Sequence, residues 1–223
     1  AAEIALNEVQ RLIDLSNVWN TRGDVAKINE TAGQGPVEIT ADTHRLITSA
    51  QIVSAASAGA FDVTIGSISG LWGIDGVDIP SEDVLTERLK LVDWTQLRLT
   101  GHTAELKNEG MSLILDGLVG GDAADSALSL IPMEWDALVN VDGDIAVRGE
   151  WQVDIPVDEA HGGGSVSMWV RDTVLVASGV DANGTLRTGV TFDYETNATT
   201  LNVRVRATDE LNATKEKAFV ISV

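Results

Sequence analysis

The amino-acid sequence predicts an α+β fold, and three observations carry this prediction. Apolar residues recur at helical spacing early in the chain and alternate with polar residues in strand fashion later. The 223 residues are 44% hydrophobic, enough for one domain with a sizeable core. Helices that precede strands, rather than alternating with them, favour an α+β protein over a doubly wound parallel sheet. We therefore expect one domain over residues 1–223, with helices packed on a mixed or antiparallel sheet.

Four helices are predicted from apolar spacing and from capping residues. Thr40 and Ser81 each stand directly before a run with helical periodicity, as helix caps do. Two glycines, Gly120 and Gly121, precede the fourth helix. The predicted helices cover residues 3–20, 41–56, 81–92 and 122–130.

Eleven strands are predicted from alternation of apolar and polar residues. The pair Asp142-Gly143 lies between two of them and is a strong signal for a hairpin turn. The predicted strands cover residues 95–100, 103–107, 111–115, 137–141, 144–148, 151–155, 165–170, 173–177, 186–192, 200–207 and 217–222.

Composition and charge exclude several classes of function. The net charge of −19 repels nucleic acid and anionic membranes. No apolar run approaches the ~20 residues that a transmembrane helix needs. The absence of cysteine excludes disulfides and thiolate metal sites. The acidic surplus and four glycosylation sequons favour an exported protein in a saline or extracellular setting; the sequons begin at Asn29, Asn183, Asn197 and Asn212.

Residues 59–74 form the most informative segment, Gly-Ala-Phe-Asp-Val-Thr-Ile-Gly-Ser-Ile-Ser-Gly-Leu-Trp-Gly-Ile. It resembles the segment Gly-Ala-Phe-Asp-x-Thr-x-Gly-Pro-Leu-x-x-Leu-Trp-Gly-Phe of the ApbE-like flavin transferases. Those exported enzymes split FAD and attach its FMN half to a Ser or Thr of another protein. The resemblance implies a single ApbE-like domain, related to the T-fold, here shortened at both ends.

Four further matches follow the family's order along the chain. Residues 16–29 resemble the exit of the family's first helix, with Trp19 in its aromatic slot. Residues 113–125 resemble Leu-Asp-Leu-Gly-Gly-Ile-Ala-Lys-Gly-Tyr-Ala-x-Asp, and residues 140–145 resemble Asn-x-Gly-Gly-Asp-Ile. Ala177-Ser-Gly stands for the family's Thr-Ser-Gly.

The resemblance also implies a cofactor site for FAD and magnesium. The flavin contacts would come from the aromatic slot, the first segment, the glycine turn, the hairpin and the Ser-Gly pair: Trp19, Asp62, Thr64, Gly117, Gly120, Gly121, Asp144 and Ser178. Magnesium takes oxygen ligands, and those implied are the carbonyl of Val119 with the side chains of Asp209 and Thr214. A glycine turn that enters a helix would also cradle phosphate through free N–H groups. Asp193 is the catalytic candidate.

Departures from the family pattern gather in this site. Gly120 replaces the family's lysine and Asp122 its aromatic residue, which removes a positive charge and adds a negative one beside the pyrophosphate. Val190 stands where the family has a histidine, so no proton can be accepted there.

Three hypotheses follow. The first is an active magnesium-dependent FAD:protein FMN transferase or FAD pyrophosphatase. The second is a catalytically degenerate protein of the same fold, a pseudoenzyme outside the cytoplasm, that serves as a structural subunit or binds flavin, an exported partner or a second copy of itself. The third is an unrelated acidic α+β module. The departures favour the second.

Overall fold

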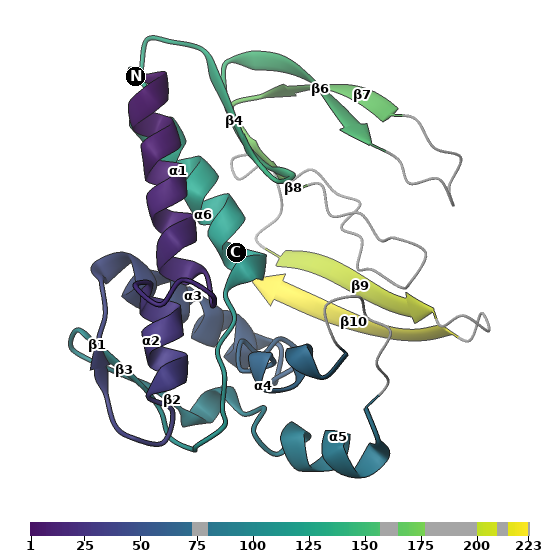
Figure 1. Ribbon diagram of the computed structural model, residues 1–223. Coiled ribbons are helices and arrows are strands. Elements are labelled where there is room, and N and C mark those ends of the chain that lie inside the picture. The colour runs from purple at the N-terminus through teal and green to yellow at the C-terminus, as the bar shows by residue number, and fades with distance from the viewer. Residues whose placement is uncertain (73–79, 157–164, 177–199, 209–213, 223) are drawn as a thin grey trace. The chain divides into compact units, whose positions relative to one another are not determined.

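The structure, a computed structural model, describes residues 1–72, 80–156, 165–176, 200–208 and 214–222 (Figure 1). For residues 200–208 and 214–222 it describes the backbone alone. Helices come first and strands come later, which confirms the predicted α+β class. The elements are α1 (Ala2–Ser16), α2 (Asp24–Glu30), β1 (Val37–Glu38), α3 (Ala41–Ala56), α4 (Gly66–Ser69), η1 (Gly70–Trp72), α5 (Glu82–Leu89), η2 (Trp94–Gln96), β2 (Leu97–Thr100), β3 (Thr103–Leu106), α6 (Asp116–Ser129), β4 (Ala137–Val141), β5 (Asp144–Arg148), β6 (Glu150–Pro156), β7 (Ser165–Arg171), β8 (Val174–Val176), β9 (Thr200–Thr208) and β10 (Thr214–Ser222).

The chain divides into two compact units. The helical unit is Gln10–Val119, and the β-rich unit is Ala1–Val9 with Gly120–Val223. The expectation of one domain over residues 1–223 stays a prediction. None of the described helices is long and apolar enough to cross a membrane.

The helical unit is organised around a buried carboxylate at the start of α2. Asp24 is 3% exposed, and its Oδ2 accepts hydrogen bonds from the Thr40 backbone N–H (2.7 Å) and the Thr43 hydroxyl (2.8 Å). Thr40 caps α3 as predicted, because its hydroxyl accepts from the Thr43 N–H. The carboxylate therefore ties the first turn of α2 to the first turn of α3.

The first helix ends at Ser16, not at residue 20 as predicted. Two asparagines provide the reason. The Asn17 side chain accepts from the Trp19 N–H (2.8 Å), and the Asn20 side chain accepts from the Arg22 N–H (3.2 Å). Such local bonds give the backbone an alternative to the helix. The short helix α2 that follows was not predicted.

Residues 111–115 form no strand, although a strand was predicted there. Their backbone makes one isolated bridge, between Ile65 and Ser112. The Asn29 side chain instead takes both backbone groups of Leu113, donating to its carbonyl (3.0 Å) and accepting from its N–H (2.7 Å). An amide side chain thus replaces the neighbouring strand that an apolar run normally requires.

In the β-rich unit, β4 and β5 form the predicted hairpin. Val141 pairs with Asp144 across a two-residue turn, and Asp142 (φ 51°) and Gly143 (φ 98°) both have left-handed backbones. The Asn140 side chain accepts from the Gly143 N–H at 2.9 Å. The hairpin prediction is confirmed.

A β-bulge joins β5 to β6 and β7 to β8. Val147 and Thr173 form the last backbone pair before it. Beyond that pair, Arg148 and Gly149 lie opposite the single residue Asp172. Gly149 (φ 82°) is required, since an added Cβ would also stand 2.3 Å from a side-chain oxygen of Asp136.

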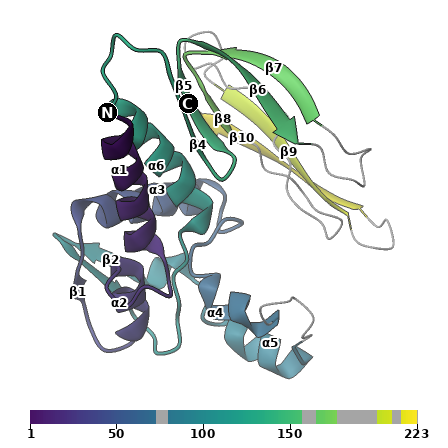
Figure 2. The same cartoon turned by 45° about the horizontal axis from the view of Figure 1, so that its top comes forward.

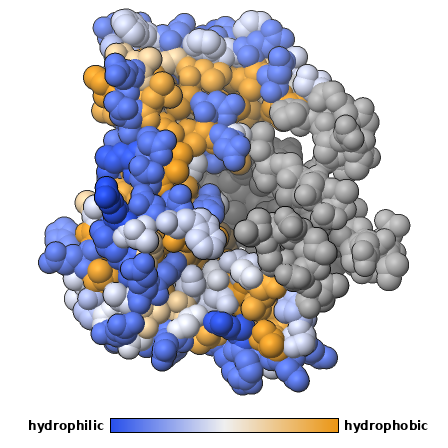
Figure 3. Space-filling view, in the orientation of Figure 1, coloured by the Kyte–Doolittle hydropathy of each residue, from blue (hydrophilic) through white to orange (hydrophobic). Residues whose placement is uncertain are grey.

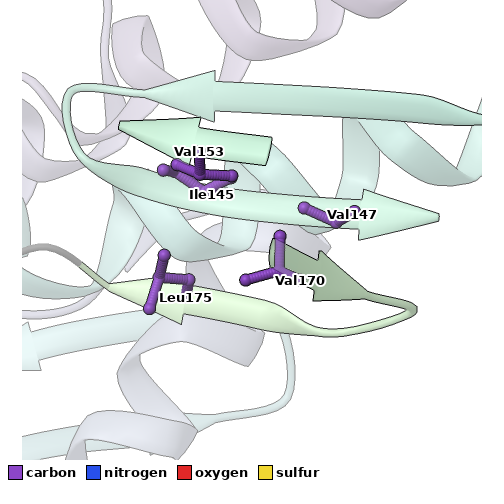
Figure 4. Packing of buried hydrophobic residues seen from close by; sticks show 5 residues of the cluster. All are labelled: Ile145, Val147, Val153, Val170 and Leu175. Carbon is purple, nitrogen blue, oxygen red and sulfur yellow. The ribbon is translucent and has the colours of Figure 1, made fainter. Parts of the chain in front are cut away.

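One apolar cluster lies between the strands on either side of this bulge (Figure 4). It comes from β5, β6, β7 and β8 and consists of Ile145, Val147, Val153, Val170 and Leu175. The order β4-β5-β8 (Figure 2) places β5 at the centre of its sheet, so its odd-numbered side chains fill this core. In Figure 3, apolar surface also gathers over β4 and β6, and Met133, Trp135 and Trp169 are among the exposed apolar side chains of this unit.

All pairings between the described strands are antiparallel, including β9 with β10. The strands predicted at 95–100, 103–107, 137–141, 144–148, 151–155, 165–170, 173–177, 200–207 and 217–222 are present with shifts of a few residues at most. The strand predicted at 186–192 lies outside the described residues.

Candidate functional site

Asp62 and Thr64 form a hydrogen-bonded knot inside the helical unit. Oδ1 of Asp62 accepts from the N–H (2.8 Å) and hydroxyl (2.6 Å) of Thr64, and Oδ2 accepts from the Trp94 N–H (2.9 Å). The Thr64 hydroxyl is fully buried and accepts from the Asp93 N–H at 2.8 Å. The predicted flavin contacts of this pair stay predictions, but its polar atoms already join residues 62–64 to the turn at 93–94.

Replacement of Asp62 by alanine is expected to lower the free energy of unfolding by about 2–3 kcal/mol, because buried N–H and hydroxyl donors lose their acceptor. Asp62→Asn is expected to cost less. Its amide oxygen can serve Thr64, but its NH₂ group then faces the donor of Trp94. Urea denaturation of the three proteins checks this order. Equal stability of all three would show that the knot does not hold the fold.

The predicted glycine turn is not a turn. The fourth helix begins at Asp116 instead of residue 122, so Gly117, Gly120 and Gly121 lie inside α6. The Leu115 carbonyl accepts from the N–H groups two and three positions into the helix (2.8 and 3.1 Å). Glycine disfavours a helix by up to about 1 kcal/mol per residue. Packing of the helix outweighs that cost here: Ala123, Ala124 and Ala127 are all buried.

The three glycines differ in what surrounds them. A Cβ added at Gly117 or Gly121 would meet no heavy atom within 4 Å. These two residues are four apart and share one face of α6. A Cβ added at Gly120 would stand 2.1 Å from Oδ2 of Asp144. The helix is therefore open at two glycines and closed at the third by a carboxylate.

Asp144 has an unfavourable environment for a negative charge. Partial burial, and to a smaller extent the charge of Asp142, raises the pKa of the Asp144 carboxyl above its ordinary value. The last turn of α6 contains no basic residue. This part of α6 therefore carries negative charge at the position where the resemblance implies a phosphate and a lysine.

The remaining predicted residues are placed as follows. Trp19 is 85% exposed in the loop after α1, free of the core and able to stack on a ring. Val119 lies in the second turn of α6, where a carbonyl accepts the helical hydrogen bond. Thr214 begins β10, but its side chain is not among those described. Asp193, Ser178 and Asp209 lie outside the described residues.

Metal binding finds no support in the described part of the chain. Among those residues, no group of three or more His, Asp and Glu side chains could hold a metal ion. The described α6 carbonyl is the one structural element of the predicted magnesium site, so magnesium binding stays a prediction.

Comparison with known proteins decides the family. The sequence model of the ApbE family matches residues 1–202. The chain belongs to the ApbE family. The FAD:protein FMN transferase of Treponema pallidum (strain Nichols) is 30% identical over 228 aligned residues, covering 87% of this chain and 62% of that protein. The FAD:protein FMN transferase of Klebsiella pneumoniae (strain 342) is 29% identical over 151 residues, covering 65% of this chain and 48% of that protein.

Solved ApbE structures share the fold. The ApbE protein of Thermotoga maritima superposes with a TM-score of 0.73 at 21% identity, covering 93% of this chain and 73% of that one. The flavin transferase ApbE of Vibrio cholerae superposes with a TM-score of 0.68 at 17% identity, covering 78% and 62%. This ApbE-family chain thus spans about 62% of the length of the Treponema relative.

Sequence reasoning found the ApbE segments but missed the contact between Gly120 and Asp144. Both residues were predicted to contact flavin, yet they are 24 positions apart and nothing in their spacing says that they touch. The signal that was present is chemical: a glycine replaces the family's lysine at one of these positions while the other keeps its aspartate.

Proposed function

We propose that this chain binds FAD at an ApbE-type site and that its transfer of FMN to a partner protein is strongly weakened. Family membership and the names of the relatives support the flavin. In the transfer, a hydroxyl oxygen of the acceptor bonds to the FMN phosphorus, the bond to the bridging oxygen breaks, AMP leaves and the hydroxyl proton is released. Magnesium, when bound, would supply charge neutralisation on the phosphates.

The observation that carries the weakening is the carboxylate of Asp144 beside Gly120. A phosphoryl group in transfer gains stability from positive charge. Here position 120 has no side chain and the nearest group is acidic. Loss of one such electrostatic contact costs about 10²–10³ in rate. The open backbone at Gly117 and Gly121 still leaves room for a phosphate group along α6.

The alternative is an active FAD:protein FMN transferase. It is favoured by the 30% identity to the Treponema enzyme over 87% of this chain. Under this alternative, another cation of the protein replaces the lysine.

One experiment separates the two. The purified chain is mixed with FAD, magnesium chloride and an acceptor peptide of the form Asp-x-x-(Ser/Thr)-Gly-Ala-Thr, beside the Treponema relative. FAD binding is measured by fluorescence, AMP by chromatography and FMN-labelled peptide by mass spectrometry. We expect binding with AMP release at least ~10²-fold slower than in the relative. Equal rates would establish the alternative, and no FAD binding would overturn the proposal.

The place of action is proposed to be outside the cytoplasm, with a partner protein or a second copy as binding partner. The acidic composition and the sequons support this. Asn29 is the one sequon asparagine among the described residues, and its Nδ2 donates to the Leu113 carbonyl, so a glycan there would have to break that bond. Mass spectrometry of secreted protein should find glycans on other sequons only.

A further inference from the structure

The contact between β5 and α6 is built from the two ends of β5. Asp144 begins this strand and its carboxylate lies against Gly120 of α6. Arg148 ends the strand and donates to the carbonyl of Leu128, near the end of α6. Eight residues of helix rise about 12 Å and four residues of strand about 13 Å, so the two elements match in length.

The backbone of Asp144 has little freedom to move away from α6. Asp144 pairs with Val141 on one side and with Val176 on the other. Ala146, on the same face of β5 two residues later, is completely buried. Only rotation of the Asp144 side chain can clear the space beside Gly120.

The clash is extensive for a side chain at position 120. The added Cβ would stand 2.1 Å from Oδ2, 3.1 Å from Cγ and 3.5 Å from Cβ of Asp144. Gly121, one residue on, would meet nothing within 4 Å. The restriction is therefore specific to the direction that faces Asp144.

We infer that Asp144 is the residue that determines which side chain position 120 can carry, and thereby the charge that α6 presents to the FAD pyrophosphate. The second half of this inference rests on the proposed function; the first does not. A lysine at position 120 must displace the Asp144 carboxylate, and its ammonium would then be neutralised by it. A cation is regained for phosphate only when both positions change.

A thermal double-mutant cycle tests the first half. Gly121→Ala is the matched control and should raise Tm by roughly 2–4 °C, since alanine is the better helix former and nothing obstructs it. Gly120→Ala should lower Tm in the unmodified protein and raise it by roughly 2–4 °C in an Asp144→Ala background. Equal gains for Gly120→Ala in both backgrounds would overturn the inference. If Gly120→Ala does not fold, rescue by Asp144→Ala supports it and failure of rescue contradicts it.

FAD affinity tests the second half. Gly120→Lys with Asp144→Ala should bind FAD about tenfold more tightly than Gly120→Lys alone, because the ammonium is then free for phosphate. Equal affinity of these two variants would overturn the effect on charge. A coupled thermal cycle in which no variant binds FAD would overturn the proposed function and leave the control of position 120 by Asp144 standing.

Discussion

Replacement of Asp24 by alanine is expected to lower the free energy of unfolding by about 3 kcal/mol. The carboxylate is buried, and its loss leaves the Thr40 N–H and the fully buried Thr43 hydroxyl without their acceptor. The ammonium of Lys27, 3.5 Å from Oδ1, also loses its partner. For a chain of this length, the melting temperature should fall by roughly 6–12 °C.

Asp24→Asn separates hydrogen bonding from charge. Both bonds converge on Oδ2, so an amide oxygen in that place keeps them, and we expect most of the stability to remain. Asp42→Ala is the surface control, since Asp42 pairs with Arg11 (2.8 Å) and Arg45 (3.2 Å) in a partly exposed site. Such pairs contribute up to about 1 kcal/mol. A loss for Asp24→Ala no larger than that of Asp42→Ala would contradict the prediction.

The Asp42 control has its own pH dependence. Burial alone would raise the pKa of Asp42, but hydrogen bonds from Arg11 and Arg45 outweigh it and hold the pKa below its ordinary value. The contribution of this carboxylate is therefore present above its ordinary pKa and is lost as the pH falls through the lowered one. The difference in stability between Asp42→Ala and the unmodified protein should vanish in acid.

Replacement of Arg148 by methionine is expected to lower the free energy of unfolding by about 2–3 kcal/mol. The guanidinium holds the end of α6 and the segment after it, at the negative end of the helix. It donates to the carbonyls of Leu128 (3.3 Å), Ile131 (3.0 Å) and Trp135 (3.1 Å) and to the sulfur of Met133 (2.9 Å).

Two variants make this result specific. Arg148→Lys should recover less than half of the loss, because one ammonium cannot reach four acceptors that a planar guanidinium spans. Arg171→Met is the control, since Arg171 forms an exposed ion pair with Glu150 and should matter little. Hydrogen exchange should show faster opening of residues 128–135 in Arg148→Met only. Unchanged exchange there would show that Arg148 does not hold this segment.

Local signals in the sequence were sufficient for the hairpin and for the helix caps. Asp142-Gly143 adopts left-handed backbone angles that few other pairs accept, and Thr40 caps α3 through its own hydroxyl. These elements depend on residues a few positions apart, so the sequence states them directly. The ApbE segments likewise identified the family, which the match over residues 1–202 confirms.

The errors concern elements whose partners are distant in sequence. Residues 111–115 have the apolar pattern of a strand, but Asn29, 84 positions from Leu113, binds their backbone. α6 begins at Asp116 although glycines follow, because the packing of buried alanines compensates for a weak intrinsic preference.

For the candidate site, the sequence by itself determined the chemistry that is missing: glycine at position 120, an extra acid at Asp122 and no histidine at Val190. Only the tertiary structure decided what occupies the space at position 120. The Asp144 carboxylate lies there because β5 runs along α6 and is held at its other end by Arg148. Which face of a helix meets which residue of a strand depends on the packing of both, and a pattern of residue types along one chain does not contain that information.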